Sequence, residues 1–87
     1  MASYKILWKK SAIKELYNIH KDIIPRIITA IDSLAKNPRP SGVKKLSETE
    51  KTFRLRVGNY RVIYELEQEK LIIQIIRVRH RKDAYRT

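Results

Sequence analysis

The sequence predicts an α+β fold in which two N-terminal antiparallel helices pack on one face of a twisted, mostly antiparallel four- to five-stranded sheet. Three observations lead to this prediction. Two apolar helical stripes follow one another between residues 11 and 36, a Gly-Asn pair joins two alternating segments at residues 58–59, and a strongly apolar segment spans residues 70–78. Helices that cover one face of an antiparallel sheet bury such elements together. The 87 residues fit one small domain, residues 1–87.

The chain is expected to begin with a strand and a helix. Residues 3–8 alternate in polarity, as a strand with one buried face does, and their apolar side is Tyr4, Ile6 and Trp8. Ser11 is suited to cap a helix that runs to about His20. Apolar and aromatic residues recur there at helical spacing and form one stripe: Ile13, Leu16, Tyr17 and His20. We therefore expect Trp8, Tyr17 and His20 to be structural residues.

A second helix is predicted from about residue 24 to Lys36. Asp22 marks a break before it, and Pro25 is tolerated in a first helical turn. Six apolar residues share the helical period: Ile24, Ile27, Ile28, Ile31, Leu34 and Ala35. The Pro- and Gly-containing segment 37–42 ends the helix. The short connection between the two helices implies that they run antiparallel.

The second half of the chain predicts the rest of the sheet. Residues 43–46 are expected to form a small strand, residues 52–66 a hairpin with its turn at Gly58-Asn59, and residues 68–69 another turn. Residues 70–78 are apolar on both faces, which places this last strand in the interior of the sheet. The alternation beyond it places Arg77, Arg79 and Arg81 on one side if the strand continues.

The predicted hairpin places two arginines directly opposite each other. A two-residue turn at 58–59 pairs Arg56 with Arg61, and the face that they share with Arg54 is basic. The other face suits a core: Phe53, Leu55, Val57, Tyr60, Val62 and Tyr64. Like charges in opposed positions destabilise a sheet. The pair therefore favours an anion bound between the two guanidinium groups over the alternative, in which both side chains extend into water.

Composition restricts the classes of partner and site. The net charge of +11 indicates an acidic partner, which can be nucleic acid, an acidic protein or an anionic surface, although a solvated basic surface gives the same total. The absence of cysteine excludes disulfides and thiolate metal sites, and two histidines predict no metal and no cofactor. No signal peptide or membrane span is recognisable, so we expect a cytoplasmic protein without a membrane partner.

Two segments carry a resemblance to a known family. They read FRLRVGNYRVIY at residues 53–64 and VRHRKDAYR at residues 78–86, and they follow the predicted helical pair and the Lys44-Lys45 segment. With these features the chain resembles the RelE/ParE superfamily of bacterial toxins, most of all its RelE branch. The resemblance implies a ribosome-dependent ribonuclease that cleaves messenger RNA in the decoding site. It also implies a cognate acidic antitoxin that binds and blocks the toxin in a hetero-oligomeric complex.

The same resemblance implies the site residues. The positions that match catalytic residues of the RelE branch are Arg54, Arg56, Arg61, Arg81 and Tyr85. Arg54 and Arg56 stand where some relatives have lysine, and the chain ends at Thr87, two residues beyond Tyr85. RNA and ribosome contacts are expected from further basic residues: Lys44, Lys45, Lys51, Arg77, Arg79, Lys82 and Arg86.

Chemistry suggests a role for each candidate. Arginines at positions 54, 56 and 61 are suited to stabilise the negative charge that gathers on the phosphoryl oxygens, and Arg81 can neutralise the leaving oxygen. Arginine does not give up its proton, so either His80 or an arginine-bound 2′-oxygen replaces a conventional base. The alternative for His80 is a partly buried histidine at a strand end. Tyr85 either stacks on a base or anchors the C-terminus.

Two other functions stay open at this point. A ParE-like inhibitor of DNA gyrase would use the same fold without an enzymatic site, and fold alone does not distinguish the two. A plain basic nucleic-acid-binding module is the third alternative. The converging arginines favour the nuclease, because a gyrase inhibitor has no need of groups that stabilise a phosphoryl transition state.

Overall fold

A computed structural model describes residues 3–41, 43–45 and 51–84 of the chain. The elements follow in the order β1 (Lys5–Trp8), α1 (Lys10–Tyr17), α2 (Ile24–Leu34), β2 (Lys44–Lys45), β3 (Thr52–Val57), β4 (Tyr60–Glu67), β5 (Ile72–His80) and α3 (Arg81–Ala84). None of the described helices is long and apolar enough to cross a membrane. The predicted α+β architecture is confirmed.

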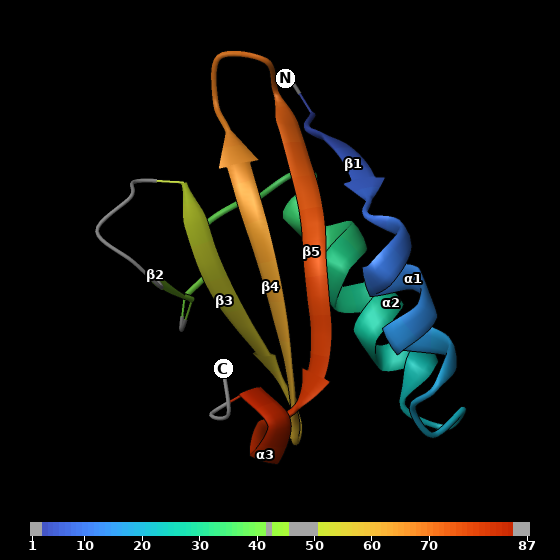
Figure 1. Ribbon diagram of the computed structural model, residues 1–87. Helices are drawn as coiled ribbons and strands as arrows, with labels where there is room; N and C mark the ends of the chain where they lie inside the picture. The colour runs from blue at the N-terminus through green and yellow to red at the C-terminus, as the bar shows by residue number, and fades with distance from the viewer. Residues whose placement is uncertain (1–2, 42, 46–50, 85–87) are drawn as a thin grey trace.

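The five strands form one twisted sheet in the order β1-β5-β4-β3-β2, and the long strands β4 and β5 cross its middle (Figure 1). Among the strands of the described residues, the β1–β5 pair is parallel and the other three pairs are antiparallel. Helices α1 and α2 cover one face, with α1 against β5 and α2 against β3. The interior position of the last strand and the small strand before the hairpin are both as predicted, although residue 46 lies outside the described residues.

The hairpin has the predicted register. Val57 pairs with Tyr60, Arg56 with Arg61, and the remaining pairs follow to Thr52 and Glu65. Gly58 has a φ of +58°, and Asn59 does not have a positive φ. A two-residue turn with glycine in the left-handed region at its first position has the twist that antiparallel strands need. A side chain at position 58 would strain this turn and displace the register of the arginines.

The core lies between the helices and the sheet. Its largest fully buried aliphatic residues come from α2 and from the two long strands: Ile27, Ile31, Leu34, Val62, Ile73, Ile75 and Val78. Tyr64 is buried among them, stacks on Phe53 and donates a hydrogen bond to the carbonyl oxygen of Pro38 at 2.7 Å. The predicted stripe of α2 is thus confirmed, and Pro25 occupies its first turn.

The predictions for the first helix were wrong in two details. Lys9, and not Ser11, is the N-cap residue, and its side chain makes no capping hydrogen bond. The backbone N–H of Lys9 donates to the carbonyl oxygen of Ile75, while its own carbonyl accepts from the N–H groups of Ala12 and Ile13. The sheet therefore fixes the N-cap of α1 two residues before the predicted Ser11.

The apolar stripe of α1 also differs from the predicted one. Ala12 and Leu16 are its buried residues, whereas Tyr17 is 77% exposed and His20 is exposed as well. The helix ends at Tyr17, so the helical spacing does not extend to His20. His20 instead lies in the following turn, where its Nδ1 accepts the N–H of Asp22 at 3.2 Å. Trp8 is half-buried and packs against the core as predicted.

A β-bulge divides β5 into two parts with opposite orientation. Tyr64 pairs with Ile75, but its neighbour Ile63 pairs with Arg77, so Ile76 is the extra residue. Before the bulge Ile73 and Ile75 face the helices, and after it Val78 does so. Since side chains alternate along a strand, the extra residue turns Arg77 and Arg79 to the face opposite the helices.

Candidate nucleic-acid interface

The sheet face opposite the helices carries a row of three arginines. Arg56 of β3 pairs with Arg61 of β4, and Arg61 pairs with Arg79 of β5, so the three lie side by side across three strands. Arg54, opposite Lys44 of β2, and Arg77 lie on the same face. We call this surface the basic face and define it by its six residues: Lys44, Arg54, Arg56, Arg61, Arg77 and Arg79.

Arg61 is at the centre of the row and is only 5% exposed. Its cross-strand neighbours on both sides are themselves arginines. Arg61 Nη1 has a long hydrogen bond of 3.5 Å to the carbonyl oxygen of Tyr60, and Arg56 Nε one of 3.4 Å to that of Gly58. Both bonds lie at or beyond the far end of the usual range and add little stability. Among the described residues, no carboxylate forms an ion pair with Arg54, Arg56 or Arg61.

This arrangement is unfavourable for the free protein. A buried guanidinium loses hydration, and neighbouring like charges raise the electrostatic energy further. A phosphate between Arg56 and Arg61 would supply the negative charge that the described part of the chain does not place there. Guanidinium groups bind phosphate through parallel N–H···O hydrogen bonds, and these are stronger than hydrogen bonds between neutral groups. The row is therefore suited to bind a phosphodiester.

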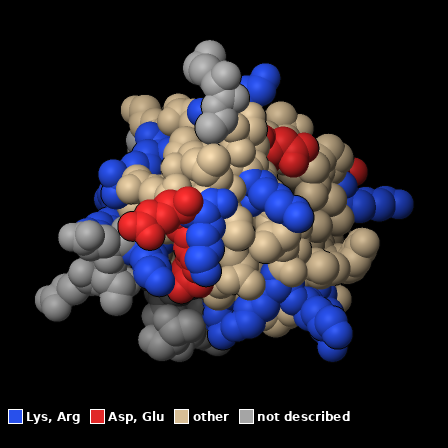
Figure 2. Space-filling view, turned by 90° about the horizontal axis from the view of Figure 1, so that it is seen from above, with Lys and Arg blue, Asp and Glu red and all other residues tan. Residues whose placement is uncertain are grey.

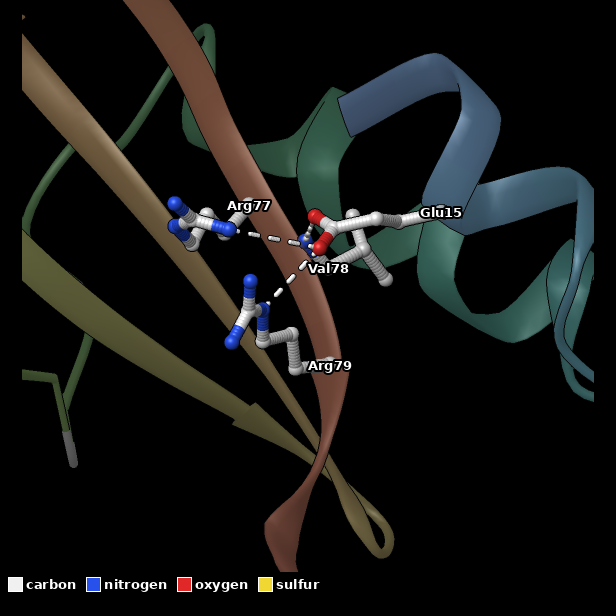
Figure 3. Close-up of polar contacts among 4 residues, drawn as sticks. All are labelled: Glu15, Arg77, Val78 and Arg79. Atoms are coloured by element: carbon white, nitrogen blue, oxygen red, sulfur yellow. Dashed lines mark hydrogen bonds and ion pairs between the residues drawn. The ribbon is translucent and has the colours of Figure 1, made fainter. Parts of the chain in front are cut away.

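The other two arginines of the basic face have a carboxylate partner from α1. Glu15 Oε2 lies 2.9 Å from Arg79 Nε and 3.5 Å from Arg77 Nη1, while Glu15 Oε1 accepts the backbone N–H of Val78 at 3.0 Å (Figure 3). Sequence reasoning missed Glu15. Its only signal was that it is the one acidic residue in α1, and nothing local connects it to a strand more than 60 residues later.

Arg81 and His80 lie where β5 ends. Arg81 opens α3, and its backbone N–H donates to the carbonyl oxygen of Asn59 at 2.7 Å, which holds α3 against the hairpin turn (Figure 1). His80 pairs with Tyr60 on the helix side of the sheet, where the two rings meet edge-on at 5.3 Å. The structure therefore brings Arg81 to the end of the sheet that holds Arg56 and Arg61, but places the His80 ring on the opposite face.

The remaining candidates are distributed around these arginines. Lys44 is exposed on the basic face, whereas Lys45 pairs with Phe53 and so belongs to the other side of its short strand. Lys51 and Lys82 are exposed. Tyr85 and Arg86 lie outside the described residues. Figure 2 shows the molecule turned by 90° from Figure 1, so that it is seen from above. Many Lys and Arg side chains and few acidic ones lie on this surface.

A cavity of about 450 Å³ opens beside the basic face, between the end of α1 and the end of β5. Its polar lining comes from Glu15, Asn18, His20, Tyr60, Arg79 and His80. Within the described ranges, no three His, Asp or Glu side chains are grouped as a metal would require. Glu15 and Arg79 both line this cavity, so their ion pair is part of its wall.

One pKa in the described structure is clearly shifted. Burial raises the pKa of Tyr64 to about 12, and the nearby Arg39 opposes this shift. Arg39 lies over the Phe53 ring, 4.8 Å from its centre, at the edge of the core. Tyr64 faces the helices, so this shift concerns the stability of the fold and not the chemistry of the basic face.

Comparison with known proteins identifies the family of the chain. Residues 6–85 match the family described as the ParE toxin of the type II toxin–antitoxin system parDE. Toxin RelG of Mycobacterium tuberculosis is 30% identical over 84 residues, which cover 95% of this chain and 97% of the relative. Toxin RelE3 of Methanocaldococcus jannaschii is 33% identical over 85 residues, covering 93% and 94%.

Two solved structures have the same fold. The RelE–RelB complex of Pyrococcus horikoshii contains a chain with a TM-score of 0.81 and 30% identity, covering 91% of this chain and 96% of that one. The RelBE2 toxin–antitoxin complex of Mycobacterium tuberculosis gives a TM-score of 0.77 and 28% identity, covering 90% and 98%. With the helices on one face of the sheet and the arginines on the other, the chain belongs to the RelE/ParE superfamily, as a toxin of the RelBE type from a type II toxin–antitoxin system.

Proposed function

We propose that this toxin is a ribosome-dependent endoribonuclease that cleaves messenger RNA in the decoding site and so inhibits translation in the cytoplasm. The names of the curated relatives, RelG and RelE3, support the RelE branch. The observation that carries the proposal is the pair of opposed arginines, Arg56 and Arg61, with Arg61 nearly buried and no carboxylate beside either among the described residues.

The arginine row is assigned the stabilisation of the transition state. In this reaction the ribose 2′-oxygen attacks the adjacent phosphorus, the bond from phosphorus to the 5′-oxygen breaks, and a 2′,3′-cyclic phosphate and a 5′-hydroxyl result. Negative charge gathers on the phosphoryl oxygens, where Arg56 and Arg61 would donate hydrogen bonds, with Arg54 beside them. Fixed donors aimed at developing charge in a site that excludes water contribute several kcal/mol.

The proton of the 2′-hydroxyl needs an acceptor that is not one of the arginines. His80 lies on the far side of the sheet, next to Tyr60, so it is not assigned this role. We assign the activation to the arginines themselves, which lower the pKa of the bound 2′-hydroxyl so that its proton passes to water. Arg81, at the start of α3, is assigned to neutralise the leaving 5′-oxygen, and Tyr85 to stack on a neighbouring base.

An acidic antitoxin is the proposed protein partner. Two of the similar structures are complexes of RelE-type toxins with their antitoxins. The net charge of +11 and the unpartnered arginines offer complementary charge to an acidic segment of such a protein. An antitoxin that covers the basic face would block RNA and neutralise Arg56 and Arg61 in the same step.

A second candidate function follows from the family description. The matched family is named for ParE toxins, so a non-enzymatic inhibitor of DNA gyrase is the alternative. A gyrase inhibitor does not need phosphate ligands that converge on one point, and its action would tolerate loss of Arg61.

Primer extension on a translated message distinguishes the two. Expression of the toxin should create new 5′ ends within translated codons, and these should vanish both in Arg61→Ala and when translation is blocked. Intact messages together with a supercoiling defect would contradict the nuclease. Cleavage of naked RNA at the same rate would contradict its dependence on the ribosome.

A further inference from the structure

We propose that Glu15 is a positioning residue for the arginine row, because it holds Arg79 beside Arg61 and fixes the strand that carries Arg79. This inference rests on the proposed function of the basic face. Glu15 itself lies on α1, outside the row, and acts through Arg79.

Glu15 lies at the edge of β5 where the pairing with β1 ends. Strand β1 pairs with β5 only as far as Trp8 and Ile75, and Lys9 then donates its N–H to Ile75 before the chain turns into α1. Beyond this point the described part of the chain places no strand on this edge of β5, although β4 continues to pair with the other edge. The N–H of Val78 therefore donates its hydrogen bond to a side chain, Glu15 Oε1, at 3.0 Å. Glu15 replaces the missing strand partner at this position.

The bulge lies close to the C-terminal end of β5. The extra residue Ile76, four residues before the strand ends at His80, turns Arg77 and Arg79 to the basic face. A bulge disrupts the ladder locally, so this end of β5 depends on other contacts for its position. The hydrogen bond from Val78 lies between the two arginines and fixes the backbone that carries both side chains.

Arg79 is held at its Nε by a partly buried ion pair with Glu15. Its hydrogen bond to Glu15 uses Nε at 2.9 Å, and the pair is about three-quarters buried, with 26% of Arg79 and 23% of Glu15 side-chain surface exposed. A guanidinium has four further N–H groups on its two Nη atoms. The Nε bond thus fixes the direction of Arg79 while leaving these donors available to a phosphate bound at Arg61.

The contact with Glu15 compensates some arginines of the basic face and not others. One carboxylate partly compensates Arg77 and Arg79, whose ion pairs both end at Oε2, whereas Arg56 and Arg61 have no such partner among the described residues. Negative charge from a substrate is therefore drawn to the Arg56–Arg61 side of the row. Arg79 contributes a guanidinium of fixed orientation, whose Nη groups are a second set of N–H donors.

Glu15→Gln tests this role, because glutamine keeps an oxygen acceptor for Val78 but loses the charge that holds Arg79. The matched control is Glu67→Gln, which removes one negative charge from an exposed ion pair with Lys70 in the connection from β4 to β5. NMR of the free toxin should show a sharp, slowly exchanging Nε–Hε resonance for Arg79 in the wild type and in Glu67→Gln. In Glu15→Gln that resonance should broaden or exchange at least tenfold faster.

Steady-state cleavage on programmed ribosomes gives the second measurement. Glu15→Gln should lower kcat roughly tenfold and change KM less than twofold, since a misdirected Arg79 affects the transition state more than ground-state binding. An unchanged Arg79 resonance, or a kcat equal to that of Glu67→Gln, would overturn the inference. Failure of the proposed function is distinguishable, because the wild type itself would then produce no cleavage on programmed ribosomes, whereas the Arg79 resonance of the free toxin would still report the contact with Glu15.

Discussion

Arg61 and Val62 are consecutive residues of β4, both are buried, and they lie on opposite faces of the sheet. Val62 faces the helices, where burial of an aliphatic side chain stabilises the fold. Arg61 faces the other side, where its neighbours across both strands are arginines. The comparison shows that burial to a similar extent has opposite effects on stability on the two faces. On one it contributes to the stability of the fold, and on the other it costs stability and prepares a charge for a ligand.

The basic face repeats this contrast on a smaller scale. Arg79 has Glu15 at 2.9 Å, and Arg61 has no carboxylate partner within the described ranges. The two side chains are adjacent in one row, so the strands that carry them do not explain the difference. It comes from α1, whose Glu15 contacts Arg79. Helix α1 reaches β5 and compensates its arginine, but does not reach the centre of the row.

The largest effect is expected for Arg61→Ala. Loss of one preorganised donor to a developing oxyanion lowers kcat by about 10²–10³-fold. Stability should stay the same or rise slightly, because the substitution removes a buried charge from between two others. Cleavage assays and urea unfolding measure the two quantities, and Arg26→Ala, an exposed arginine on α2, serves as the control. A large fall in thermal midpoint would show that Arg61 is structural.

Val62→Ala is the matched test of the opposite face. Removing two buried methyl groups should lower the free energy of unfolding by roughly 2–3 kcal/mol, while cleavage per folded molecule stays close to that of the wild type. Denaturant titration at neutral pH, followed by assays at a temperature where the variant is fully folded, checks both. Loss of cleavage in a Val62→Ala variant that folds normally would contradict the assignment of stability to the helix-covered face and activity to the basic face.

A smaller effect on the helix-covered face depends on pH. The pKa of Tyr64 is raised to about 12 in the folded protein, above an unfolded value near 10. The stabilisation is therefore fully present below pH 10 and is lost as pH rises through the folded pKa. Between pH 9 and 11 the wild type should lose about 1.4 kcal/mol more than Tyr64→Phe. Parallel unfolding curves for the two proteins over this range would contradict the assignment.

The smallest effect is expected for His80→Gln. Because His80 lies beside Tyr60 on the helix side of the sheet, its side chain should not take part in the cleavage reaction. The kcat of this variant should stay within about twofold of the wild type in the same cleavage assay. A larger loss of kcat in a variant that folds normally would return His80 to the mechanism and would require it to reach the other face.

Local patterns in the sequence determined much of this protein. The Gly58-Asn59 turn and strict alternation placed Arg56 opposite Arg61 and separated the basic face from the core, because a two-residue turn allows one register. The spacing of isoleucines defined the buried side of α2, and the apolar composition of β5 placed it inside the sheet. These features depend on contacts within a few residues or on a simple period.

Tertiary structure decided the rest. Plain alternation would have placed Arg77 and Arg79 on the side of Ile75, and the bulge at Ile76, which no local pattern marks, reverses them. The packing of Ala12 and Leu16 sets the buried side of α1, which leaves Tyr17 exposed, and the helix ends at Tyr17, which leaves His20 in the following exposed turn despite its spacing. Glu15 meets Val78 and Arg79 only once β1 and β5 have paired in parallel, since residues so distant in sequence are brought together by topology alone.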